Sequence, residues 1–305
     1  MSLQACEIKG EMFEIGCGEE GWPQSFECLP NGMDRIYGIG SRSVLLEPCL
    51  AVIGARRATP YGLAAAEMAG RIAAECGVVV VSGGAMGCDA AACRAAMSAG
   101  GNVIVISGCG ADVIYPRSSE DVFLEASRRG GAVISFEKWG TPPRRYAFPK
   151  RNRAIAALCT SLIVTEAGVP SGTFGTAQEA DALGRNVYSV PGSIFSPESR
   201  GTNQLIEQGA AVIVDELSLE SRISLDFSRQ RIIVPTETPD RGRVLSALVA
   251  SPMRADEIST RLGSDVLTVV RSLSDYEARG LVERLPDGRY VASREALLME
   301  NEKDC

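Results

Sequence analysis

Histidine is absent from this chain of 305 residues. Its absence excludes Ser-His-Asp and Cys-His catalysis, and with them every metal site that needs a histidine ligand. The ten cysteines do not supply a metal site either: no two have the CxxC spacing typical of zinc ligands, and Cys88 and Cys93 are the closest pair. We therefore expect no bound metal, and any catalysis would depend on carboxylates, Lys, Arg, Ser or Tyr.

Two widespread nucleotide-binding motifs are also missing. No GxGxxG opens a helix with an acidic residue about 20 residues later, and no GxxxxGK[ST] is present. The sequence therefore argues against NAD binding of the usual Rossmann type and against P-loop ATP hydrolysis. We expect no cofactor.

Long apolar runs are lacking as well. No stretch of about 18 apolar residues is present, and the N-terminus lacks the basic-then-apolar pattern of a signal peptide. We therefore expect no membrane span and a cytoplasmic protein whose ten cysteines are reduced. The net charge of −7 argues against nucleic acid coating the whole surface, but it is compatible with one basic groove.

From residue 50 onward, short apolar runs alternate with helix-like segments rich in Ala, Glu and Arg. Runs that are apolar at every position are typical of parallel strands buried on both faces. The sequence therefore predicts an α/β fold with an extended Rossmann-like, doubly wound and mainly parallel sheet. The expected strands are Leu50–Gly54, Val78–Ser82, Asn102–Ser107, Ala132–Phe136, Leu162–Thr165, Asn186–Val190 and Ala211–Asp215.

Glycine-rich turns follow five of these strands. Ligands of such folds bind beyond the carboxyl ends of the strands, so the turns mark one expected site. Glycines let the backbone approach an anion, and the helix N-termini that follow direct N–H groups at it. One such turn is a weak signal, since α/β proteins need tight turns anyway, but five at one edge favour a phosphate-bearing ligand. The turns begin at Gly54, Ser82, Ser107, Glu166 and Pro191.

The basic segment, residues 141–153, lies between the fourth and fifth expected strands. It has no acidic residue, although the chain as a whole is acidic. Arg side chains grip phosphates with two donors, and aromatic rings stack on bases. Such a run alone is more often a solvated loop, but its place beside the glycine turns favours a site for a polyanion. Its cations are Arg144, Arg145, Lys150, Arg151 and Arg153, and its aromatic residues are Tyr146 and Phe148.

Composition divides the chain into five parts. Residues 1–48 show no clear pattern, and 49–218 form the expected α/β domain. Residues 219–240, rich in Ser, Arg, Glu, Pro and Thr, predict a linker, and 294–305 a tail. Between these, 241–293 show three helix patterns and a hairpin, the order of a small winged-helix domain. Its third helix is slightly acidic, so we expect a protein contact or self-association there rather than duplex DNA.

Several motifs, in order, resemble the DNA-processing protein A family, also called DprA or Smf. They cover about residues 50–215, and the winged helix fits the family's usual C-terminal unit. Met86, Cys88 and Cys93 depart from the family pattern, which often has a basic residue, Ile and His there. The matching motifs are Val52-Ile-Gly-Ala-Arg56, Thr59-Pro-Tyr-Gly62, Val80-Val-Ser-Gly-Gly-Ala-Met-Gly-Cys-Asp89, Tyr115-Pro116, Gly140-Thr-Pro-Pro143, Phe148-Pro-Lys-Arg-Asn-Arg-Ala-Ile155, Glu166-Ala167, Ser171-Gly172, Val190-Pro-Gly192, Gly201-Thr-Asn-Gln-Leu-Ile206 and Gly209-Ala210.

The resemblance implies a bacterial protein, commonly dimeric, that binds single-stranded DNA and helps to load the RecA recombinase during natural transformation and homologous recombination. We therefore expect a binding protein rather than an enzyme, with little sequence preference because phosphates and stacked bases are its contacts. The expected DNA-binding residues are Arg56, Ser82, Gly83, Gly84, Arg144, Arg145, Phe148, Lys150, Arg151, Asn152, Arg153, Ser171 and Gly172.

An enzyme is the alternative. Residues 171–179 are similar to the PGGxGTxxE motif of the cytokinin-activating nucleotide hydrolases, which share a Rossmann-like fold. In that interpretation Arg151 or Arg153, together with Glu179, would cleave the N-glycosidic bond of a nucleoside monophosphate. The first glycine of the motif is replaced by Ser171 here, and the fused winged helix also argues against this function.

Overall fold

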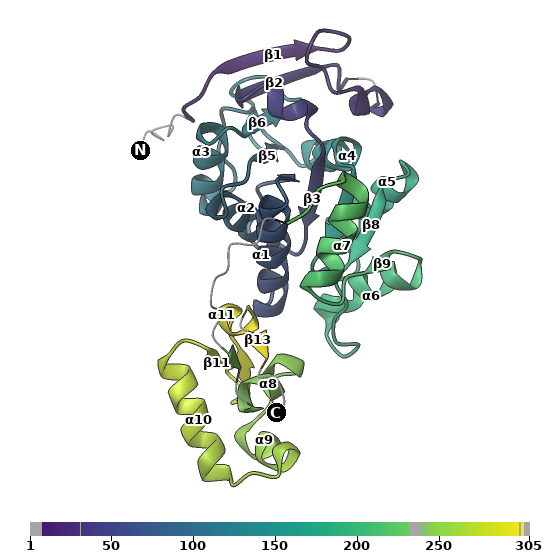
Figure 1. Cartoon of the computed structure of the whole chain (residues 1–305). Helices are drawn as coiled ribbons and strands as arrows, with labels where there is room; N and C mark the ends of the chain where they lie inside the picture. The colour runs from purple at the N-terminus through teal and green to yellow at the C-terminus, as the bar shows by residue number, and fades with distance from the viewer. Residues whose placement is uncertain (1–7, 31, 232–239, 242, 299, 302–305) are drawn as a thin grey trace. The chain divides into compact units, whose positions relative to one another are not determined.

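The computed structural model describes residues 8–30, 32–231, 240–241, 243–298 and 300–301. The chain divides into two compact units, a large α/β unit and a small C-terminal unit that includes residues 234–305. Figure 1 labels the helices and strands of both. In the part of the chain that the structure describes, no helix combines the length and apolarity needed to cross a membrane.

The α/β unit is organised around one sheet, whose nine described strands follow the order β1-β2-β6-β5-β4-β3-β7-β8-β9. β2 pairs antiparallel with both β1 and β6, and all other neighbours are parallel. The chain steps outward from β3 to β6 and then returns to the other side of β3, so β3 and β7 flank the switch point where such folds hold ligands. The strands are β1 Met12–Gly16, β2 Arg35–Gly40, β3 Cys49–Ile53, β4 Val79–Ser82, β5 Val103–Ile106, β6 Ala132–Ser135, β7 Ser161–Val164, β8 Asn186–Ser189 and β9 Ala211–Val212.

Helices cover both faces of this sheet (Figure 1). Cys49, Ala51 and Ile53 of β3 join the core cluster that contains residues 154–158 of α4. Leu50 and Val52, which alternate with them and therefore point to the other face, are also fully buried. Burial on both faces explains why these strands are apolar at every position. The helices are α1 Pro60–Glu75, α2 Cys88–Ser98, α3 Glu120–Arg128, α4 Ala147–Leu158, α5 Gly172–Ala182, α6 Arg200–Glu207 and α7 Glu216–Phe227.

The predicted fold class is confirmed. All seven predicted strands are present as β3 to β9, and six of them agree with the prediction to within one residue at each end. β9 ends at Val212 instead of Asp215, because Asp215 is already the N-cap of α7. Residues 1–48, which show no clear sequence pattern, contribute the β1–β2 pair at the sheet edge.

The prediction of a linker at 219–240 is wrong for its first part. Helix α7 extends to Phe227 and begins at a capping box. Leu219 and Ile223, four residues apart, are buried, whereas most of the helix is polar. The composition hides this helix because only a narrow stripe of it faces the core. The part of the predicted linker at 232–239 lies outside the described residues.

The C-terminal unit has the predicted order of three helices and a hairpin, packed around an apolar core that includes Leu245, Ile258 and Leu273. The predicted tail is wrong at its start: residues 294–297 form a helix, because the Ser293 hydroxyl caps it by accepting the Ala296 N–H. The elements are β10 Asp240–Arg241, α8 Arg243–Ala250, α9 Ala255–Leu262, α10 Val266–Ala278, β11 Val282–Arg284, β12 Tyr290–Ala292, α11 Arg294–Leu297 and β13 Glu300–Asn301.

Asp226, near the end of α7, ties this helix to the sheet. Its carboxylate accepts hydrogen bonds from the Ser161 hydroxyl at 2.5 Å, the Tyr188 hydroxyl at 2.7 Å and the Asn186 side-chain amide at 2.8 Å. Ser161 is fully buried and Tyr188 is only 5% exposed, so water does not readily replace the carboxylate.

We expect Asp226→Ala to lower the free energy of unfolding of the α/β unit by about 2–3 kcal/mol, because two buried hydroxyls lose their acceptor. Urea unfolding followed by circular dichroism measures this loss. Glu125→Ala, which removes the exposed ion pairs with Arg128 and Arg129 on α3, is the control and should cost less than about 1 kcal/mol. Equal costs for the two variants would show that Asp226 does not anchor α7.

Candidate nucleic-acid interface

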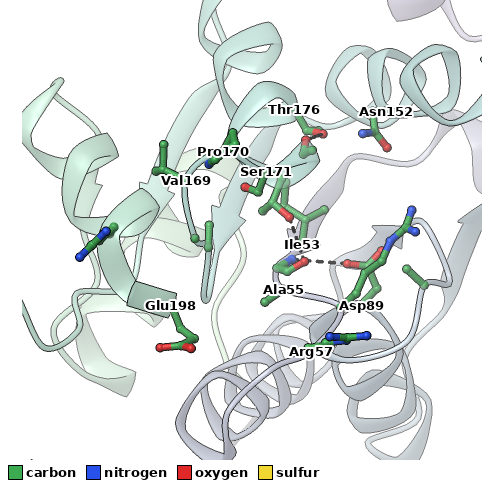
Figure 2. Close-up of a pocket in the computed structure, with 18 of the residues that line it drawn as sticks. Ile53, Ala55, Arg57, Asp89, Asn152, Val169, Pro170, Ser171, Thr176 and Glu198 are labelled. Atoms are coloured by element: carbon green, nitrogen blue, oxygen red, sulfur yellow. Dashed lines mark hydrogen bonds between the residues drawn. The ribbon is translucent and has the colours of Figure 1, made fainter. Parts of the chain in front are cut away.

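A pocket of about 500 Å³ opens at the switch point between β3 and β7 (Figure 2). It is lined by residues 53–57 at the end of β3 and just after it, residues 167–173 after β7, residues in the middle of α4 (Arg151, Asn152 and Ile155), and the short helix Pro197–Ser199 after β8. Its volume lies in the range of small-molecule and nucleotide sites. The pocket therefore occurs at the sheet edge where the glycine turns predict a ligand.

The N-terminus of α5 forms one wall of this pocket. The Ser171 hydroxyl caps the helix by accepting the Phe174 N–H at 3.2 Å, and the Thr173 hydroxyl donates to the Gly54 carbonyl at 2.9 Å. Two predicted residues, Ser171 and Gly172, line the pocket together with the predicted Asn152 of α4 (Figure 2 labels Ser171 and Asn152). The positive end of the α5 dipole at this wall favours an anion.

Four arginines and two acids stand among the described residues that line the pocket. Arg56, Arg57 and Arg200 are exposed, and none of them forms an ion pair with another residue that the structure describes. Arg56 is a predicted site residue, whereas Arg57 and Arg200 were not predicted. Arg57 follows Arg56 directly, and Arg200 opens the helix after the Pro191 turn, so position along the predicted edge could have identified both. The acids are Asp89 and Glu198.

Asp89, in the first turn of α2, holds the loops behind the pocket together. Its carboxylate accepts the Gly54 N–H at 3.4 Å, and the backbone amides of Gly83 and Ala85 also bond to it. Burial raises the pKa of Asp89, while the nearby Arg151 guanidinium and these amides oppose the rise. Asp89 was not predicted as a site residue, and its role here is to position the loops after β3 and β4.

Arg151 is buried, with only 6% of its surface exposed. Its Nη1 donates to the Ile106 carbonyl at 3.3 Å, and its guanidinium packs on Gly83, where any β-carbon would overlap it. Burial lowers the pKa of Arg151, Asp89 counteracts this effect, and the neighbouring Arg56 adds to it. Arg151 still lines the pocket, so its positive charge can attract an anion bound there. It is not, however, the solvent-exposed arginine in contact with phosphate that the basic segment predicts.

Phe148 forms a second, smaller recess beside the pocket. Its ring lies 5.8 Å from the Tyr115 ring, and the Arg56 guanidinium stands over it at 5.4 Å. A β-carbon on Gly108 would come within 2.8 Å of the ring, so this glycine is needed for the approach. Phe148 is half-buried and Tyr115 is 42% exposed, so apolar ring surface and a cation meet at the edge of the sheet.

The five cations of the basic segment differ in their partners and in their directions. Lys150 forms an ion pair with Glu137 at 3.2 Å, and Arg153 forms one with Glu179 at 3.0 Å. From Ala147 onward the segment is helical, so its cations point to different sides of α4. Arg144 and Arg145, in the loop before the helix, are exposed and have no ion-pair partner among the described residues.

Two further predicted residues lie away from the pocket surface. Ser82 is fully buried, and its hydroxyl donates to the Val52 carbonyl of the neighbouring strand at 2.7 Å, so the prediction that it contacts a ligand is wrong. Gly84 is also buried and has a positive φ of 61°, which lets the turn after β4 pass under Phe123. Gly83 differs from them, because it lines the recess beside Phe148.

Two protein-family models match the chain. The model described as DNA recombination-mediator protein A matches residues 14–223, and the model described as DprA winged helix domain matches residues 234–288. The first match alone covers more than half of the chain and includes every residue of the pocket and the recess.

Curated relatives carry the same names. The chain is 35% identical over 263 residues to Protein Smf of Escherichia coli (strain K12), which covers 81% of this chain and 68% of that protein. It is also 35% identical over 194 residues to the DNA processing protein DprA of Streptococcus pneumoniae, which covers 61% of this chain and 68% of that protein.

Solved structures agree with these matches. The X-ray structure of DNA processing protein A from Streptococcus pneumoniae superposes with a TM-score of 0.64 at 31% identity, covering 70% of this chain and 75% of that chain. DNA processing protein A from Helicobacter pylori, described for its single-stranded DNA binding mode, superposes with a TM-score of 0.65 at 29% identity, covering 72% of this chain and 99% of that chain. The fold, the order of the motifs and these matches agree, and the chain belongs to the DNA recombination-mediator protein A family, the family of DprA and Smf.

Proposed function

We propose that this protein binds single-stranded DNA along the carboxyl edge of its sheet, without strong sequence preference, and delivers the strand to a RecA-type recombinase during homologous recombination or natural transformation. The observation that carries the proposal is a group of exposed arginines, without ion-pair partners among the described residues, gathered at one sheet edge of a chain with net charge −7. These are Arg56, Arg57, Arg144, Arg145 and Arg200. The single-stranded DNA binding mode described for the Helicobacter pylori relative supports the same ligand.

The aromatic residues near these cations favour unpaired bases. Tyr146 is 56% exposed beside Arg145, and Phe148 and Tyr115 form the recess next to Arg56. A base stacks on such rings only when it is not already stacked in a duplex. Every base has an aromatic face, and arginines hold phosphates rather than base edges, so the proposed site tolerates sequence changes.

Family membership supports three parts of this proposal: recombinase loading, dimer formation and a cytoplasmic location. One feature supports a self-contact: Leu217 and Leu225 of α7 are 70% and 74% exposed, and Val214 just before the helix is 67% exposed. Exposed apolar side chains of this size mark protein contacts when they gather on one surface. We propose that α7 contributes to a homodimer.

We expect the double variant Arg144→Ala/Arg145→Ala to reduce the slope of log Kobs against log salt for oligothymidylate by about 1.4, because each neutralised phosphate contributes about 0.7 for single strands. Fluorescence anisotropy at several salt concentrations measures the slope. Arg128→Ala/Arg129→Ala, at the carboxyl end of α3, makes the same change in net charge away from the predicted edge and should leave the slope unaltered. The same slope for both double variants would contradict a phosphate contact by the loop arginines.

Phe148→Leu should weaken the binding of oligothymidylate by about 5- to 150-fold, the loss expected for one stacked base. Leu retains an apolar side chain over Gly108 but removes the ring, and Phe148→Tyr, which keeps the ring, should bind like the unmodified protein. Circular dichroism checks that both variants are folded. If Leu and Tyr at this position bind equally well, Phe148 is a packing residue and not a stacking platform.

The hydrolase alternative can be tested on the same protein. The Arg153 and Glu179 side chains pair with each other, and neither is among the described residues that line the pocket. We therefore expect incubation with AMP to release no free adenine, as measured by chromatography. Release of adenine that is lost in Glu179→Gln would establish the enzyme instead.

A further inference from the structure

Two solvent-exposed apolar side chains lie on the loop that follows β8. Phe195 is 90% exposed and Ile194 is 78% exposed, more than any other large apolar residue in the described part of the chain. Neither is among the described lining residues of the pocket or of the recess beside Phe148. A single exposed leucine needs no explanation. A phenylalanine that is 90% exposed at the predicted ligand edge of the sheet indicates a binding partner for its ring.

The loop that carries Phe195 is held in place by its own hydrogen bonds. The Asn203 side chain accepts the Gly192 N–H at 3.1 Å and donates to the Gly192 carbonyl at 3.0 Å. The Ser193 hydroxyl accepts the Phe195 N–H at 3.3 Å, and the Ser193 carbonyl accepts the Ser196 N–H at 3.0 Å. The ring is therefore presented to solvent by an organised turn, so little conformational entropy is lost when something stacks on it.

The position of this turn connects it to the proposed site. It leaves the carboxyl end of β8, and the residues directly after it, Pro197, Glu198 and Arg200, line the pocket. Four strand spacings separate β5, whose end forms the recess with Phe148, from β8, which corresponds to about 19 Å along the sheet edge. Two aromatic positions therefore lie on opposite sides of the pocket with arginines between them.

We propose that Phe195 is a second base-stacking platform, and that bound single-stranded DNA crosses the sheet edge from the Phe148 recess, over the pocket, to the loop after β8. Arg200, which lines the pocket, neutralises a phosphate of the bound DNA on the side of the pocket nearer the loop after β8. This inference rests on the proposed function and adds to it the path and the minimum span of the bound strand. Arg200, which lies five residues after Phe195 and lines the pocket, favours a nucleic-acid partner over an apolar protein surface.

The test compares Phe195→Ala, Phe195→Tyr and the neighbouring control Ile194→Ala by fluorescence anisotropy. The probes are oligothymidylates of about 4 and about 16 nucleotides, the range of single-strand site sizes. We expect Phe195→Ala to bind the long probe about 5- to 150-fold more weakly and the short probe almost unchanged, since the short probe is filled by the recess and pocket. Tyr should restore binding of the long probe, and Ile194→Ala should have little effect.

The failures of the two proposals are distinguishable. If the unmodified protein binds neither probe, the proposed function is wrong and this inference falls with it. If the unmodified protein binds both probes and Phe195→Ala binds the long probe equally well, the proposed function stands and only the role of Phe195 as a second stacking platform is wrong. A Phe195→Ala variant that keeps its DNA affinity but loses oligomeric mass in light scattering would assign the ring to self-association and likewise overturn the inference.

Discussion

The arrangement of the site depends on the contacts that the buried Arg151 guanidinium makes. It comes from α4, donates to the end of β5, and packs on the glycine turn after β4. It also lies near Asp89, which in turn holds the loop after β3. Burying a charge costs several kcal/mol unless partners compensate. The nearby Asp89 carboxylate and the Ile106 carbonyl offset part of this cost, while Nε is buried without a hydrogen-bond partner among the described residues. One side chain thereby joins four elements at the ligand edge.

This arrangement separates the cations into two kinds. Arg151 is buried, and Lys150 and Arg153 are paired with carboxylates, so these three contribute less field to solvent than unpaired cations do. Arg56 and Arg57 at the pocket remain solvated, as do Arg144 and Arg145 in the loop before α4. In a chain with net charge −7, a few solvated cations on one edge attract a polyanion there and leave the remaining surface repulsive.

Most of the fold could be predicted from the sequence, because parallel strands buried on both faces are apolar at every position. The ligand edge followed from the same pattern and from the geometry shared by all doubly wound sheets, and Arg56 was identified there. Asn152, Ser171 and Gly172, which line the pocket with Arg56, were identified from the resemblance to the family.

The errors have a different physical origin. Lys150 and Arg153 look free in the sequence, but their partners Glu137 and Glu179 come from other parts of the chain and meet them only after folding. The Ser82 hydroxyl bonds to a neighbouring strand that a linear pattern does not reveal. Helix α7 was missed because its buried stripe is narrow and its composition resembles a linker.

Photocrosslinking tests the central claim most directly. An oligothymidylate that carries photoreactive thymines would be irradiated with the full-length protein, and the attached peptides would be mapped by mass spectrometry. The account predicts crosslinks in residues 108–116 and 141–153, at the carboxyl edge of the sheet. Crosslinks confined to residues 243–297, or to the opposite edge near the carboxyl end of α3, would contradict it.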